Sequence, residues 1–221
     1  MTTAPAFFFD LDGTLTDPKP GITGCIQYAL ERLGAPVPSK DDLEWCIGPP
    51  LLANFEQLVG PLQASRGVEL YRERFGDIGL FENEVYAGIP DVLTELGNAG
   101  ARLFVASSKP KVYVDRILDH FDLSQHFETI YGSELDGTRN DKRDLLAYAL
   151  TETNLPPQTT TMIGDRGADT TGALYNKMNF LGVLYGYGSK EELSNAGTTT
   201  FAQTPTDLPT HLRPQIPRTT E

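Results

Sequence analysis

Four short apolar runs recur along the chain, and each run stops at small or acidic residues. Their residues are continuously apolar and do not alternate with polar ones, which is typical of strands in a parallel sheet that helices cover on both faces. We therefore expect four buried strands, at residues 6–9, 103–106, 161–163 and 180–183.

Between these runs the apolar residues recur at the spacing of helices. The helical patterns cover residues 91–99, 110–121 and 144–150, and Gly100 follows the first of them as a stop signal. Strands that alternate with helices indicate a layered α/β fold, in this case a doubly wound, Rossmann-like parallel sheet.

One segment departs from this alternation. Residues 17–84 hold no convincing strand, and instead show amphipathic helical groups that stop at Gly34 and Gly60. We interpret residues 17–84 as a helical domain inserted into an α/β core made of residues 1–16 and 85–221. The chain from about residue 205 is rich in Pro and Thr, and is expected to form a short last helix or a loosely held tail.

Composition narrows the class of protein. The chain has 221 residues, 39% of them hydrophobic, which is enough for a packed core. Its formal net charge of −12 argues against a partner that is a nucleic acid polymer or an anionic membrane. A local cationic site could still bind a small phosphorylated molecule.

The cysteines and the N-terminus indicate a reducing compartment. Cys25 and Cys46 do not make a disulfide framework, and the three histidines lack the spacing of zinc ligands. No apolar run approaches the ~20 residues of a membrane helix. The first ten residues lack the basic region of a signal peptide. We expect a soluble, cytoplasmic protein.

The first candidate for chemistry is the acidic end of the first strand. Asp10 and Asp12 are two positions apart, so their side chains project to the same side while Leu11 points away. Two carboxylates that lie this close repel each other unless one is protonated or a cation lies between them. Gly13 permits a turn that closely approaches a ligand.

Two other strand ends carry matching groups. Ser107 and Ser108 follow the second strand, and Asp165 and Asp169 follow the third. In a doubly wound sheet these ends converge at the ligand-binding edge. Hydroxyls and helix-start N–H groups bind phosphate, and several carboxylates around one point suit Mg²⁺. Lys142, which opens a helix between these strands, could supply the cation that a phosphate needs.

Together these motifs resemble those of the haloacid dehalogenase superfamily of phosphatases, over almost the whole chain. Asp10-Leu11-Asp12-Gly13-Thr14 matches the nucleophile motif, Ser107 the second motif, Lys142 the third, and Gly164-Asp165 with Asp169 the fourth. The inserted helical segment has the position and size of that family's small α-helical cap. The chain looks most like the phosphoglycolate phosphatase and 5′-nucleotidase-like branch.

The resemblance implies a mechanism. Asp10 would be the nucleophile that forms an aspartyl-phosphate, and Asp12 the general acid and base. Mg²⁺ would be held by a carboxylate oxygen of Asp10, the backbone carbonyl of Asp12 and a carboxylate of Asp165. Asp169 would orient the metal shell or pair with Lys142. The groups expected to hold the phosphoryl oxygens are Ser107, Lys142 and backbone N–H groups near Asp12, Gly13 and Ser108.

The second Asp of the first motif also separates reactions within the superfamily. Dehalogenases and phosphonatases lack the residue that matches Asp12, and phosphonatases use a cap lysine, for which only Lys19 and Lys40 are candidates here. Three functions stay open: a phosphomonoester hydrolase, a sugar phosphomutase and a catalytically silent binding protein.

The substrate is open between phosphoglycolate, which we place first, and a nucleoside 5′-monophosphate. The insertion holds six Lys/Arg against eleven Asp/Glu, so a small phosphate ester is favoured over a long polyanion. Its aromatic residues could stack on a nucleobase or form the insertion's own core. They are Tyr28, Trp45, Phe55 and Tyr71. The oligomeric state is not readable from the sequence.

Overall fold

A computed structural model describes residues 4–216 of the chain. The chain divides into two compact units. The residues up to Leu15 and those from Val85 onward form the first, and Thr16–Glu84 forms the second.

The first unit is built on a six-stranded sheet in the order β5-β4-β1-β6-β7-β8. Every neighbouring pair in it is parallel, which confirms the doubly wound α/β fold. The strands are β1 (Ala6–Phe9), β4 (Arg102–Pro110), β5 (Thr129–Ser133), β6 (Thr160–Gly164), β7 (Asn179–Val183) and β8 (Phe201–Ala202).

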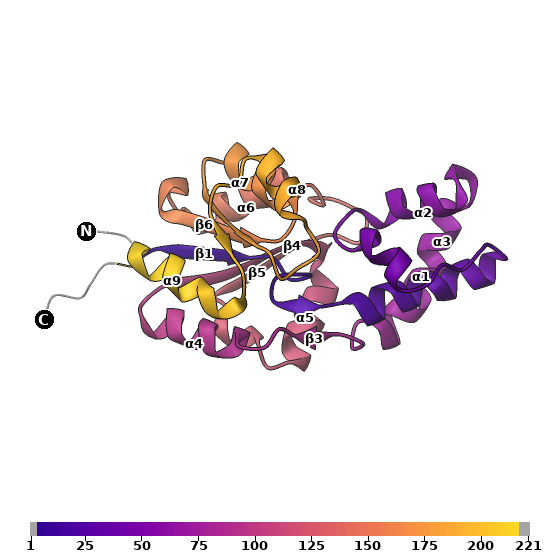
Figure 1. Ribbon diagram of the computed structural model, residues 1–221, viewed down its shortest axis with the longest axis horizontal. Coiled ribbons are helices and arrows are strands. Elements are labelled where there is room, and N and C mark those ends of the chain that lie inside the picture. The colour runs from indigo at the N-terminus through magenta and orange to yellow at the C-terminus, as the bar shows by residue number, and fades with distance from the viewer. Residues whose placement is uncertain (1–3, 217–221) are drawn as a thin grey trace, which may run out of the picture. The chain divides into compact units, whose positions relative to one another are not determined.

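Helices cover both faces of this sheet, as its continuously apolar strands require (Figure 1). One face carries α6 (Lys142–Thr153), α7 (Gly167–Tyr175) and α8 (Lys190–Ala196). The opposite face carries α4 (Ile89–Asn98), α5 (Lys111–His120) and α9 (Leu208–Leu212). Short 3₁₀ turns connect these elements at Ser124–His126, Pro157–Thr159, Pro205–Asp207 and Arg213–Gln215.

Strand β1 is the centre of the core. All four of its residues are buried. The ring of Phe8 stacks on Phe104 at a centroid distance of 4.7 Å, within the cluster that also holds Leu145 and Met162. On the other face Phe9 meets Phe127 edge to face. Because the side chains of β1 are buried on both faces of the sheet, the position of Phe9, and with it the start of the loop at Asp10, is fixed.

The start of α6 is set by a side-chain cap. The carboxylate of Asp141 accepts a hydrogen bond from the backbone N–H of Arg143 at 2.8 Å, which satisfies one of the free donors at the helix start. The helix ends at Asn154, whose left-handed conformation stops it. The cap places Lys142 at the first position of the helix.

The second unit is mainly helical. It contains α1 (Lys19–Leu33), the 3₁₀ segment η1 (Asp41–Cys46), α2 (Leu51–Val59), α3 (Pro61–Arg74) and the π-helical turn η2 (Phe75–Gly79). Helices α2 and α3 pack closely because Gly67 faces the ring of Phe55, where an added Cβ would lie 2.5 Å from a ring carbon. Cys25 and Cys46 are buried, and neither forms a disulfide bond within the described residues.

The sequence analysis missed four strands. At the ends of the insertion β2 (Thr16–Asp17) pairs with β3 (Glu84–Val85), and each has only two residues. Strand β5 lies at the sheet edge with Thr129 exposed, and β8 also has only two residues. From residue 205 to residue 216 the C-terminal segment folds as α9 and its flanking turns, as the expected short helix, and residues 217–221 lie outside the described part of the chain. Within residues 4–216, none of the helices has the length and apolar character needed to cross a membrane.

Candidate active site

The candidate site lies where the strand order reverses around β1. The chain passes from β1 to β4 and β5 on one side, and later to β6, β7 and β8 on the other. This reversal leaves a crevice at the carboxyl ends of the central strands, which is where doubly wound sheets bind ligands. Asp10 follows β1, Ser107 lies near the end of β4, and Asp165 follows β6.

Three carboxylates meet at this edge. Asp10, Asp165 and Asp169 each offer an oxygen, and these three atoms lie within 4.8 Å of one another. All three residues are buried. Lys142 joins them, with its Nζ 3.1 Å from Oδ1 of Asp10 and 2.7 Å from Oδ1 of Asp169. The ammonium also donates to the carbonyl of Ala106 at 2.8 Å, which ties it to β4.

One ammonium does not balance three buried carboxylates, and the pKa values follow from this excess of negative charge. Burial raises the pKa of Asp165 well above its usual range, and the neighbouring Asp169 and Asp10 raise it further. Burial also raises the pKa of Asp169 to about 6, although Lys142 opposes the shift. For Lys142, burial alone would lower the pKa, but Asp10 and Asp169 outweigh it and raise the pKa.

A glycine-rich loop fixes the carboxylate of Asp165. The backbone N–H of Tyr187 donates to its Oδ2 at 2.8 Å. Two positions of this loop have room only for glycine. An added Cβ at Gly186 would lie 2.3 Å from the carbonyl oxygen of Gly13, and one at Gly188 would lie 1.7 Å from the carbonyl oxygen of Asp165. Within the described part of the chain, Oδ1 of Asp165 has no hydrogen-bond partner.

The arrangement of these oxygens fits a hard cation. Oδ1 of Asp165 is buried without a partner, and Oδ1 atoms of Asp10 and Asp169 meet the ammonium of Lys142 only as ion pairs, without hydrogen-bond geometry. Leaving a buried carboxylate oxygen uncompensated is costly. A divalent cation with oxygen ligands would relieve that cost, so the described residues suit Mg²⁺.

The side chain of Asp12 lies outside this carboxylate cluster. It forms an ion pair with Lys109, whose Nζ lies 2.7 Å from Oδ1 of Asp12. Burial raises the pKa of Asp12, and the charge of Lys109 opposes that rise. A side chain outside the cluster is compatible with the expectation that Asp12 would hold a metal through its backbone carbonyl and not through its carboxylate.

Lys109 is a site residue that the sequence analysis did not select. It lies in an irregular part of β4, where the register against β5 shifts between Ser107 and Pro110. The lysine was visible in the stretch Ser107-Ser108-Lys109-Pro110, but a shift of register leaves no mark in the hydrophobic pattern. The glycines of the Asp165 loop were also missed, because the groups that leave no room for a Cβ there belong to residues distant in sequence.

The remaining predicted residues lie around the same edge. Ser107 is buried, and its Oγ accepts from the backbone N–H of Lys109 at 3.3 Å. The carbonyl of Ser108 accepts from the hydroxyl of Ser133 at 2.8 Å. Gly13 has a φ of +79°, a conformation that favours glycine. Asp169 pairs with Lys142 and also accepts from the backbone N–H of Arg166 at the start of α7.

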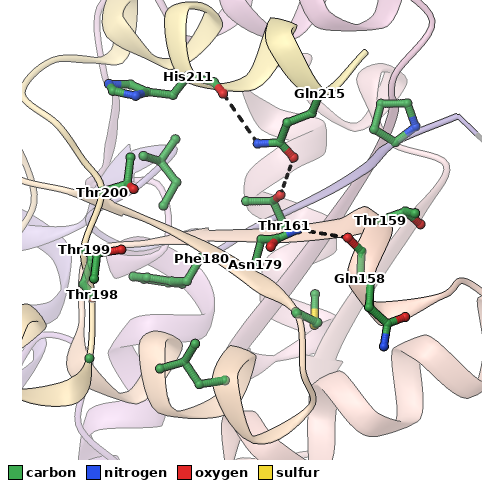
Figure 2. A pocket seen from close by; sticks show the side chains of 15 residues that line it. Gln158, Thr159, Thr161, Asn179, Phe180, Thr198, Thr199, Thr200, His211 and Gln215 are labelled. Atoms are coloured by element: carbon green, nitrogen blue, oxygen red, sulfur yellow. Dashed lines mark hydrogen bonds between the residues drawn. The ribbon is translucent and has the colours of Figure 1, made fainter. Parts of the chain in front are cut away.

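A cavity of about 730 Å³ lies at the opposite edge of the sheet (Figure 2). It is bordered by Thr161 and Asn179, which lie near the amino ends of β6 and β7, and by Gln215. Its polar groups bond to one another, as where the Thr161 hydroxyl donates to Oε1 of Gln215 at 2.7 Å. None of the predicted site residues borders it. This cavity is therefore separate from the candidate active site at Asp10.

Comparison with known families agrees with the geometry of this edge. The model of the family described as haloacid dehalogenase-like hydrolase matches residues 7–183. The chain belongs to this family. The match spans β1 to β7, and so includes every predicted site residue.

Named relatives give the class of activity. The chain is 49% identical over 191 residues to a 5′-nucleotidase of Pseudomonas aeruginosa, covering 86% of each chain. It is 31% identical over 192 residues to a phosphoglycolate phosphatase of Caulobacter vibrioides, covering 83% of this chain and 80% of that one. A predicted phosphatase from Clostridium acetobutylicum has a structure with a TM-score of 0.91 at 39% identity, covering 96% of this chain and all of that one. The chain is a phosphatase of the haloacid dehalogenase-like family.

One relative carries a different activity in its name. The chain is 38% identical over 191 residues to the tyrosine-protein kinase PtkA of Mycobacterium tuberculosis. The match covers 86% of this chain but 66% of that one. The same α/β frame therefore occurs in a longer protein named for phosphoryl transfer to tyrosine.

Proposed function

We propose that the protein is a Mg²⁺-dependent phosphatase that hydrolyses a small phosphate monoester through an aspartyl-phosphate on Asp10. The observation that carries this proposal is the placement of the Asp10 carboxylate. It belongs to the carboxylate cluster, pairs with the ammonium of Lys142, and comes directly after the central strand. A carboxylate oxygen at this position can act as the nucleophile.

In the first step, an oxygen of Asp10 attacks phosphorus and the bond to the leaving oxygen breaks. Asp12 delivers a proton to that oxygen, and its raised pKa favours the protonated form that this step needs. In the second step Asp12 takes a proton from the water that attacks the aspartyl-phosphate. Ser107, Lys142 and the backbone N–H groups near Gly13 and Ser108 hold the phosphoryl oxygens.

The residues proposed to hold Mg²⁺ are Asp10, Asp165 and the backbone carbonyl of Asp12. When bound, the ion would offset the repulsion between the anionic nucleophile and the anionic substrate. We propose that Asp169 orients Lys142, because it pairs with the ammonium at 2.7 Å while its other oxygen caps α7. The second unit, Thr16–Glu84, is proposed to be the cap that selects the substrate.

Among substrates, we now place a nucleoside 5′-monophosphate ahead of phosphoglycolate. The relative named 5′-nucleotidase is 49% identical to this chain, against 31% for the one named phosphoglycolate phosphatase. Two of the aromatic residues considered for base stacking, Phe55 and Tyr71, are buried in the core of the second unit. Trp45 keeps 37% of its surface exposed and is the better candidate.

The test is release of inorganic phosphate from p-nitrophenyl phosphate, nucleoside 5′-monophosphates, phosphoglycolate and a hexose phosphate. We expect Mg²⁺-dependent release that EDTA abolishes, and a loss of at least about a thousandfold in Asp10→Asn, because the nucleophile is removed. Asp91→Asn, an exposed carboxylate in the first turn of α4, serves as the matched control and should keep full activity.

Three other outcomes of this test would each change the proposal. Failure to release phosphate from every ester would contradict hydrolysis. Isomerisation of the hexose phosphate without release would identify a phosphomutase. Preference for phosphoglycolate over every nucleotide would restore the original order of substrates.

A further inference from the structure

Asp12 is proposed to move protons, yet among the described residues its side chain forms no hydrogen bond or ion pair with the cluster around Asp10. The group that contacts it is Lys109, whose ammonium lies 2.7 Å from Oδ1 of Asp12. The two side chains are only 9% and 11% exposed, so solvent screens this pair little. Lys142 pairs with Asp10 and Asp169 instead, so each lysine serves different carboxylates.

The backbone holds Lys109 in place. Ser107 pairs with Gly132 and Pro110 with Ser133, so Ser108 and Lys109 form a bulge in β4. The Ser133 hydroxyl bonds to the carbonyl of Ser108, which fixes the bulge to β5.

A glycine allows the bulge to pack this closely. An added Cβ at Gly132 would lie 2.9 Å from the carbonyl oxygen of Lys109 and 2.7 Å from the backbone nitrogen of Lys111. Bulges of this kind re-aim a side chain. Here the result is a lysine that points at Asp12.

We propose that Lys109 is a positioning residue that orients Asp12 as the general acid, a proposal that rests on the proposed function. The ammonium donates to Oδ1, so the proton to be transferred sits on Oδ2. As the bond from Asp10 to phosphorus forms, the bond from phosphorus to the leaving oxygen breaks, and its electron pair stays on that oxygen. The Oδ2 proton then moves to the same oxygen, and Lys109 keeps all of its own protons.

The test uses kcat/KM for two esters of similar size, p-nitrophenyl phosphate and phenyl phosphate. The p-nitrophenolate ion is stable enough to leave without being protonated. The phenolate ion is more basic, so it leaves much faster when a general acid protonates it. The value of kcat/KM depends only on the steps up to departure of the leaving group. It is therefore unaffected by any later role of Asp12 in activating water. The ratio of the two values is also independent of the fraction of folded enzyme.

We expect Lys109→Met to lose at least about tenfold more on phenyl phosphate than on p-nitrophenyl phosphate, since a positioned acid contributes ~10²–10⁴-fold. Lys109→Arg, which keeps the charge, should lose less on phenyl phosphate than Lys109→Met. Lys111→Met is the matched control, because Lys111 lies two residues away in an exposed pair with Asp115 and should leave both values unchanged.

Equal losses on both esters in Lys109→Met, or no loss on either, would overturn the orientation of Asp12 by Lys109. So would equal losses in the Arg and Met variants. A wild-type enzyme that releases phosphate from neither of these esters nor from any nucleoside 5′-monophosphate, phosphoglycolate or hexose phosphate would instead refute the proposed function, and the role of Lys109 would fall with it.

Discussion

Lys142 shows how much of the site depends on single side chains. It is a buried ammonium, and two of the three clustered carboxylates contact it. The sequence places it at a helix start but gives no sign of its burial, because a lone lysine in a polar stretch is usually solvated. Asp10 and Asp165 were easier to find, since each follows an apolar strand directly. The pairing of Asp12 with Lys109 could not be found, because it needs a bulge in β4.

Asp207 offers a pH-dependent test at the level of one residue. Its Oδ2 accepts from the backbone N–H groups of Thr204 and Gln203 at 2.8 and 3.0 Å, and the bond from Thr204 is the main cause of its lowered pKa. A carboxyl whose pKa is lowered by folding stabilises the protein above its unfolded pKa, and this contribution is lost as pH falls through the folded pKa. We expect Asp207→Asn to lower the thermal midpoint by about 2–4 °C at neutral pH.

The difference between the wild type and Asp207→Asn should shrink as the pH falls below about 4, the unfolded pKa of Asp, and on through the lower pKa of the folded protein. Thermal unfolding followed by circular dichroism at several pH values measures it. Asp77→Asn, at an exposed position of the second unit, is the control. A difference that stayed constant with pH would show that the carboxylate charge of Asp207 is not the source of the stability.

At the level of elements, the sequence predicts what is buried on both sides and misses what lies at an edge. The apolar runs at β1, β4, β6 and β7 were found because helices cover both of their faces. Strand β5 contains only Ile130 and Tyr131 as apolar residues, and β8 is too short to show a pattern. Their existence follows from sheet pairing, which links residues that are distant in sequence.

The loop between β7 and α8 makes a prediction of its own. Gly186 faces both Gly13 and the carboxylate of Asp165, with an added Cβ 2.6 Å from Oδ2. Gly186→Ala should therefore displace Asp165 and weaken Mg²⁺ binding by about 10–100-fold, as is typical when a ligand loses its support. Gly97→Ala is the control, because a Cβ there meets nothing within 4 Å and alanine favours the helix.

The measurement for these two variants is the thermal midpoint as a function of Mg²⁺ concentration. Gly186→Ala should need a higher concentration for half of the wild-type shift, whereas Gly97→Ala should follow the wild type. An unchanged Mg²⁺ dependence in Gly186→Ala would show that the loop does not hold Asp165 in place.

At the level of the whole molecule, chain connectivity gathers the chemistry at one edge of the sheet. The acidic residues come from the ends of β1 and β6 and from α7, and Lys142 comes from α6, so distant parts of the sequence meet there. The cavity beside Thr161 lies at the other edge, and none of the residues selected for catalysis lines it. The fold class could be predicted because it follows from the buried strands, and the edge that we propose for the reaction because it follows from where those strands end. The substrate could not, because the helical insertion carries no motif that names it.

The excess of negative charge at the reaction edge predicts how the metal affects stability. Three buried carboxylates face one lysine in a chain of net charge −12, so a bound divalent cation should stabilise the folded state. At about one hundred times its Kd, a ligand adds ~2.7 kcal/mol. For a chain of this size each kcal/mol raises the midpoint by about 2–4 °C, so EDTA should lower it by about 5–10 °C. Because burial raises the pKa of the proposed ligand Asp165 well above its usual range, protons compete with the cation as the pH falls and the shift should decline at acidic pH. Asp165→Asn should abolish the shift, and a full shift in that variant would place the cation elsewhere.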